Sequence, residues 1–68
     1  MPLTIRLLRE VDGRWIGGVP ELPGVTVYGA TAEDATRKAK VLALRVIAEE
    51  MEHGEIDFTG LLQFSVAS

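Results

Sequence analysis

The stretch that decides the fold is residues 3–19, LTIRLLREVDGRWIGGV, in which two extended runs flank an Asp-Gly pair. In residues 3–11 the first apolar side chains alternate with polar ones, which is the period of two expected of a strand with one buried face. Asp12 and Gly13 tolerate positive φ and favour a tight turn into a second strand at residues 14–19. The sequence therefore predicts an antiparallel hairpin.

A proline-bracketed loop and a third strand follow. The loop is PELPG at residues 20–24, and it is rigid because each proline lacks an amide donor and holds the preceding residue extended. Residues 25–29, VTVYG, are β-branched and aromatic and predict a strand that ends at Gly29. Gly17 and Gly18 in the second run predict a bulge or the close approach of another backbone.

One long helix is predicted from Thr31 to about His53. Thr31 and Asp34 resemble a capping box with Asp in place of the usual Glu or Gln, and Gly54 is a typical C-terminal stop. We expect one stripe of this helix to cover the sheet, with small residues allowing close approach at its N-terminal end. The stripe consists of Ala35, Ala39, Leu42 and Val46, with Ala32 and Ala43 beside it.

The last strand is predicted at residues 62–66, where apolar and polar residues alternate, whereas residues 56–60 are ambiguous. The element order is strand, strand, strand, helix, strand. This order predicts an α+β fold, a three-to-four-stranded sheet with one long helix packed on it. The 68 residues leave room for a single domain, residues 1–68.

Composition excludes several classes of protein. The net charge of −3 argues against phosphate binding as the main activity and favours a basic partner. Four basic residues in the middle of the helix are better explained by pairing with acids one turn away. No apolar run approaches the roughly 18 residues that span a bilayer, and no signal peptide is evident, so we expect a cytoplasmic protein without a membrane partner. A domain this small gains from self-association, because it buries only about 60% of its unfolded surface.

Groups for catalysis are few. The chain has no Cys, a single His at position 53 and serines only at positions 65 and 68, so neither a nucleophilic triad nor a zinc site can be assembled. His53 suits the negative end of the helix dipole. The acids serve as turn, capping and solvated helix-end residues. We therefore expect a protein without enzymatic activity, metal or cofactor.

A second helical stripe lies roughly opposite the sheet-facing one. Its members recur at spacings of three, four and three residues: Val41, Leu44, Ala48 and Met51. One sheet cannot bury both stripes. Two interpretations remain open: the second stripe contacts another subunit or partner, or residues 56–61 fold back over it.

Two segments, EVDGRWIGGVPELPGV at residues 10–25 and GATAEDA at residues 29–35, resemble the HicB-like antitoxin family. An Asp-Gly turn, a Trp strand, a Pro-Glu-Leu-Pro-Gly loop and a Gly-x-Thr helix start occur in the family's order and spacing. The resemblance implies a partial ribonuclease-H-like fold without nuclease activity. It also implies dimers or larger assemblies and binding of a small basic HicA-type toxin that cleaves messenger RNA.

Longer members of that family carry a C-terminal DNA-binding segment, and this sequence ends directly after its last strand, so direct DNA binding is not expected. Trp15 is expected in or beside the core, and Glu21 either contacts a basic partner or is a solvated loop acid. The alternative function is a stand-alone homo-oligomer with a different or lost partner, such as a small ligand or RNA. The candidate partner-binding residues are Trp15, Glu21, Leu22, Pro23 and Tyr28.

Overall fold

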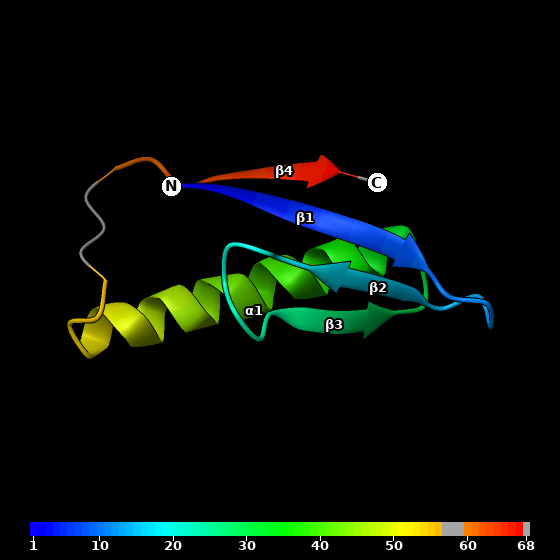
Figure 1. Cartoon of the computed structure of the whole chain (residues 1–68), viewed down its shortest axis with the longest axis horizontal. Helices are drawn as coiled ribbons and strands as arrows, with labels where there is room; N and C mark the ends of the chain where they lie inside the picture. The colour runs from blue at the N-terminus through cyan, green and yellow to red at the C-terminus, as the bar shows by residue number, and fades with distance from the viewer. Residues whose placement is uncertain (57–59, 68) are drawn as a thin grey trace.

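Four strands and one helix make up the fold (Figure 1). A computed structural model describes residues 1–56 and 60–67. The elements are β1 (Pro2–Arg9), β2 (Trp15–Gly18), β3 (Thr26–Gly29), α1 (Ala32–Glu52) and β4 (Gln63–Ala67). The predicted α+β class and the predicted element order are both confirmed.

The strands form one mixed sheet in the order β3-β2-β1-β4. β2 pairs antiparallel with both β1 and β3, whereas β4 pairs parallel with β1. A parallel partner requires a long crossover connection. α1 provides most of that connection, because it returns the chain from the end of β3 to the end of the sheet where β1 and β4 begin (Figure 1).

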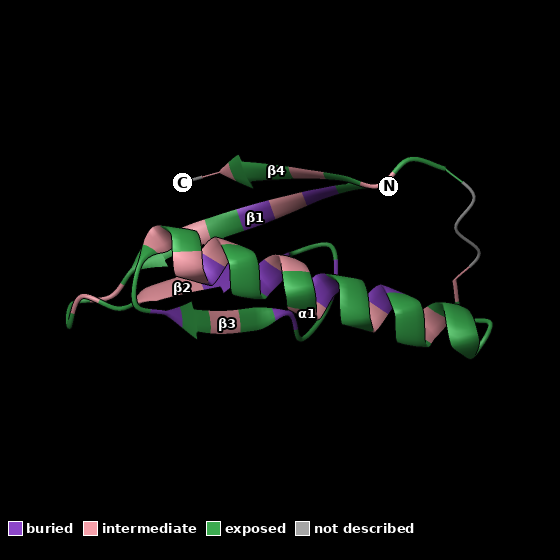
Figure 2. Ribbon diagram, turned by 180° about the vertical axis from the view of Figure 1, so that it is seen from behind, coloured by how far each residue is buried: buried purple, intermediate pink, exposed green. Residues whose placement is uncertain are grey.

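The core lies between α1 and one face of the sheet, and the other face has no helix (Figures 1 and 2). The two most buried large side chains of the central strand, Leu3 and Ile5, are 2% and 0% exposed. Beside them lie residues of the loop between β2 and β3 and of the helix. The buried hydrophobic residues are Leu3, Ile5, Val19, Leu22, Val25, Ala35, Ala39, Ala43 and Ile47.

The sheet-facing stripe of α1 differs in part from the predicted one. Ala35 and Ala39 are buried as expected, but Ala43 and Ile47 continue the row, while Leu42 and Val46 are only partly buried. At about 100° per residue, a row of every fourth residue winds slowly around a helix. Such a row stays in contact with a sheet that itself twists, which the sequence pattern alone does not reveal.

β1 is shorter than predicted because its turn begins earlier. It ends at Arg9 rather than at residue 11. The amide of Glu10 donates to the carbonyl of Arg14 at 2.7 Å, and Gly13 has a φ of +94°. The turn therefore includes Arg14, and β2 begins one residue later than expected.

The loop between β2 and β3 is packed, and this packing shortens both strands. Val19 donates to the carbonyl of Val25, and Leu22 donates to the carbonyl of Val19, each at 3.0 Å. All three side chains are buried. Val19 and Val25, predicted as strand residues, are instead the two ends of this loop.

The helix begins very close to the sheet. A Cβ added at Gly29 would lie 2.4 Å from the amide nitrogen of Ala35, and one added at Gly17 would lie 2.9 Å from its carbonyl oxygen. Real Cβ atoms do not approach backbone atoms so closely. The close backbone approach predicted at Gly17 is thus confirmed, and Gly29 makes a second one.

Both predicted helix ends are confirmed. Thr31 is the N-cap, and its hydroxyl accepts from the amide of Asp34 at 3.0 Å. His53 is the C-cap, with Nδ1 2.9 Å from the carbonyl of Glu49, and Gly54 follows with a φ of +72°. The last strand is one residue later than predicted. Within the ambiguous segment, residues 57–59 lie outside the described part of the chain.

Candidate functional site

The helix-free face of the sheet carries a row of large apolar side chains. Leu8 lies opposite Ile16 across β1 and β2, and Ile16 lies opposite Tyr28 across β2 and β3. Leu8 is 63% exposed and Tyr28 48% exposed. We call these three residues the open-face row. Directly opposed side chains on neighbouring strands lie close enough to form one surface.

Arg14 covers one end of the open-face row. Its guanidinium carbon lies 4.6 Å from the centre of the Tyr28 ring, within the range of a cation–π contact. The Arg14 Nε also donates to the Asp12 carboxylate at 2.8 Å. The hairpin turn thus holds Arg14 between an acid and an aromatic ring, which orders that ring before any partner arrives.

A groove of about 550 Å³ runs beside the row. It lies between the strands of the open face and the loop that joins β2 to β3. Its walls are mainly apolar, with an arginine and a threonine as polar groups. The residues that line it include Arg6, Leu8, Ile16, Leu22, Pro23 and Thr26.

Glu21 is exposed on the loop that lines this groove but makes an internal contact. Its Oε1 accepts from the amide of Thr4 at 3.1 Å. That hydrogen bond, helped by the nearby charge of Arg6, holds the pKa of Glu21 below its ordinary value of 4.5. The carboxylate is ionised near neutral pH, and one of its oxygens is hydrogen bonded to the backbone of β1.

The structure does not bring all of the predicted partner-binding residues together. Pro23 and Tyr28 border the helix-free side, and Leu22 lines the groove but is only 6% exposed, so it chiefly anchors the loop in the core. Trp15 lies opposite Gly29 in the register and so points to the helix side of the sheet. It is half-buried there, as expected for a residue beside the core.

Leu8, Ile16 and Arg14 were not predicted from the sequence as residues of this site. Leu8 is out of phase with the buried positions Leu3 and Ile5 of its strand, and this alternation is the signal that could have found it. Ile16 and Tyr28 carry the same signal in their strands. The alignment of the three residues depends on strand register, which spans separate parts of the chain.

The second helical stripe, Val41, Leu44, Ala48 and Met51, is exposed in the single chain. Val41 is 41% exposed, and Leu44 and Met51 are each 45% exposed. The described residues of the segment 56–61 therefore do not cover it. We call these four residues the outer stripe of α1.

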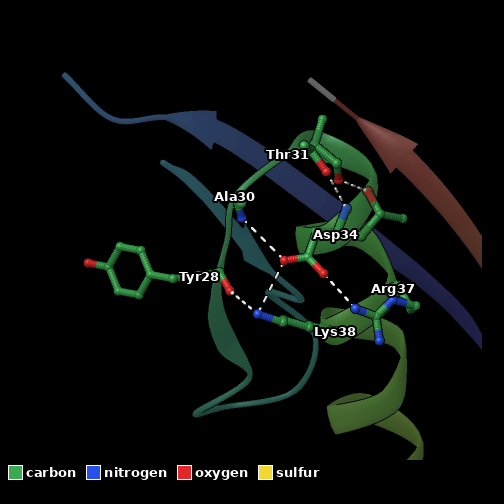
Figure 3. Close-up of polar contacts among 8 residues, drawn as sticks. Tyr28, Ala30, Thr31, Asp34, Arg37 and Lys38 are labelled. Carbon is green, nitrogen blue, oxygen red and sulfur yellow. Dashed lines mark hydrogen bonds and ion pairs between the residues drawn. The ribbon is translucent and has the colours of Figure 1, made fainter. Parts of the chain in front are cut away.

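A polar cluster at the start of α1 accounts for several charged residues (Figure 3). The Asp34 carboxylate accepts from the amide of Ala30 at 3.2 Å and pairs with Arg37 and Lys38. The hydrogen bond from Ala30, and next the one from Lys38, lowers the pKa of Asp34. Lys38 also donates to the carbonyl of Tyr28 at 3.3 Å. The cluster thus joins the helix to the edge strand β3, and the Tyr28 ring points away from it.

The described residues contain few groups arranged as catalysis would require. Across residues 1–56 and 60–67, no three His, Asp or Glu side chains gather as a metal site would require. The carboxylates that are perturbed have lowered pKa values, explained first by hydrogen bonds from backbone amides, whereas a general acid needs a raised pKa. The same described residues contain no helix with the length and apolarity needed to cross a bilayer.

Comparison with known proteins gives no significant match for this chain among protein-family models, curated proteins or solved structures.

Proposed function

We propose that this protein is a non-enzymatic, antitoxin-like binding domain that holds a small basic HicA-type toxin and masks its active site. The sequence motifs that resemble the HicB-like family support the choice of partner. The observation that carries the proposal is the open-face row beside an apolar groove, in which Leu8 and Tyr28 are exposed and Ile16 is partly buried between them.

Binding through the open face has a physical basis. Apolar side chains that line up on a sheet and stay exposed lower the free energy of a complex when a partner removes them from water. Tyr28 is a typical anchor, because it combines a large rigid ring with a polar end, and Arg14 already restrains it. The Pro-Glu-Leu-Pro-Gly loop supports one wall of the groove and needs little ordering on binding.

Charge supports a basic partner. The chain has a net charge of −3, and an RNA-cleaving toxin needs cationic groups to hold phosphates. Glu21 lies between the groove-lining residues Pro20 and Leu22, and its carboxylate is ionised near neutral pH. In the described residues only one of its oxygens is hydrogen bonded to Thr4, so the other can accept a hydrogen bond from a partner.

The test uses the product of the neighbouring reading frame, a short basic chain in this proposal, titrated against the full protein by calorimetry. We expect binding by the wild type and loss of the toxin's RNA cleavage in the complex. Tyr28→Ala and Leu8→Glu should each weaken the complex on the order of tenfold or more, because both remove an exposed anchor. Leu44→Glu is the matched control on the helix side and should leave the affinity unchanged.

Two results would contradict the proposal. Wild-type affinity in both Tyr28→Ala and Leu8→Glu would place the partner surface away from the open face. Failure of the wild type to bind the neighbouring product would remove this toxin as the partner.

The second candidate function is a homo-oligomeric domain of the same fold that binds a small ligand or RNA in the groove. The observation in its favour is the groove itself, which places Arg6 and Thr26 beside apolar walls. Titration of single-stranded RNA in the same calorimeter separates the candidates. The second candidate function would be favoured if the protein binds RNA, Arg6→Ala abolishes that binding, and the product of the neighbouring reading frame does not bind.

A further inference from the structure

The four residues of the outer stripe of α1, Val41, Leu44, Ala48 and Met51, are all exposed in the single chain. Single exposed apolar residues are common on protein surfaces. Here Val41, Leu44 and Met51 are each more than 40% exposed and follow one line along the helix. Such a line is an interaction surface rather than scattered exposure.

We infer that α1 of a second copy packs antiparallel on this stripe, which gives a two-fold symmetric dimer. The spacings of three, four and three residues are the same in both chain directions. A two-fold interface needs this property, because residue i must contact j while j contacts i. Antiparallel packing places Val41 against Met51 of the second copy and Leu44 against Ala48 of the second copy. The larger Leu44 then fits over the small alanine.

Charge selects the antiparallel direction. Residues 37–45 contain four basic residues and no acid, whereas residues 49–55 contain four acids and no Lys or Arg. An antiparallel pair sets the basic half of each helix against the acidic half of the other. A parallel pair would set like charges together, which disfavours the complex. Asp34 offsets part of the basic half through Arg37 and Lys38, whereas Arg45 and Glu52 lie exposed beside the stripe.

The dimer leaves the open face free. α1 and the open-face row lie on opposite sides of the sheet (Figures 1 and 2). Two copies joined through their helices would therefore present two open faces that point outwards. This inference does not depend on what binds the open face.

Cross-linking tests both the surface and the direction. The chain has no cysteine, so single cysteines can be placed as Val41→Cys and Met51→Cys. Antiparallel pairing brings position 41 of one copy to position 51 of the other, within the roughly 7 Å between Cα atoms that a disulfide needs. Two copies of position 41 would be about 15 Å apart along the helix axis, at about 1.5 Å per residue. We expect mild oxidation to cross-link a mixture of the two variants but neither variant alone.

Sedimentation gives the second test. The wild type at micromolar concentration should sediment with twice the 7.4 kDa monomer mass. Leu44→Glu should raise the dimer dissociation constant on the order of tenfold or more, because it places two carboxylates in the apolar seam. Leu8→Glu on the open face is the control and should still give the dimer. Circular dichroism of both variants should match the wild type, since both side chains are exposed in the monomer.

Three results would overturn the inference. A wild-type monomer at these concentrations excludes the dimer. If each cysteine variant cross-links with itself and the two variants do not cross-link with each other, the two helices run parallel. Dissociation by Leu8→Glu and not by Leu44→Glu places self-association on the open face.

Discussion

Glu21 lies on an exposed loop, yet its carboxylate completes the hydrogen bonding of the central strand. β2 pairs with β1 only from Arg6 onward, so the earlier amide of Thr4 has no β2 partner. The Glu21 Oε1 accepts from that amide at 3.1 Å. Glu21 therefore supports the backbone of β1 from an exposed loop.

This contact predicts a pH-dependent contribution to stability. The hydrogen bond from Thr4 lowers the folded-state pKa of Glu21 below its ordinary value of 4.5. Stabilisation is then fully present above the unfolded-state pKa and is lost as pH falls through the lower folded-state pKa. We expect the free energy of unfolding to decrease over that acidic range in the wild type. Glu21→Gln, which keeps an amide acceptor, should lack this component.

Carboxyl-carbon NMR of Glu21 and urea unfolding at several pH values measure this effect. Glu21→Ala is the matched variant and should lower stability at neutral pH as well, because it removes the acceptor. A Glu21 titration midpoint at or above 4.5 would contradict the assignment.

At the scale of elements, the position of α1 on the sheet depends on two glycines and an alanine. Gly17 and Gly29 provide the surface against which the first turns of α1 rest, with Ala35 as the contact. A capped N-terminus at Thr31 holds the helix in that position. Small residues on both sides let the two backbones meet, and the larger Ile47 fills the core farther along the helix.

Gly29→Ala should therefore displace the helix start. The added methyl carbon would lie 2.4 Å from a backbone atom, which cannot move aside as a flexible side chain would. Overpacking of this kind costs about 1–3 kcal/mol. Urea unfolding should show a lower midpoint with an unchanged slope. Gly60→Ala, which meets nothing within 4 Å, is the control and should change stability by less than about 0.5 kcal/mol. Equal midpoints for the two variants would show that the helix adjusts freely.

At the scale of the whole molecule, one thin core holds the sheet and helix together. A chain of 68 residues, at about 0.05–0.15 kcal/mol per residue, has a stability of roughly 3–10 kcal/mol. Ile5 is 0% exposed on the central strand. Ile5→Ala should cost about 2–5 kcal/mol, which is a large part of that total.

Thermal unfolding at fixed protein concentration measures this loss, since a dimer would make the melting temperature depend on concentration. Leu8→Ala on the same strand is the control. Leu8 is 63% exposed, so its truncation should cost less than about 0.5 kcal/mol. A smaller loss for Ile5→Ala than for Leu8→Ala would mean that the assignment of the two sheet faces is wrong.

Sequence patterns predicted the elements well and the candidate site only in part. The Asp-Gly turn, Thr31 and Gly54 are local signals, and each occurs where a turn or helix end is observed. The outer stripe of α1 also followed from spacing along one helix. The open-face row could not be predicted in this way, because Leu8, Ile16 and Tyr28 come from three strands and no single segment determines their register.

The sequence by itself determined the order and type of the elements, because strand alternation, helix caps and turn residues act over a few neighbouring positions. Only the tertiary structure decided which residues meet. β4 pairs parallel with β1, Glu21 bonds to Thr4, and the helix rests on Gly29. These contacts join segments far apart in the chain. Their geometry follows from packing one twisted sheet against one helix, which no local pattern specifies.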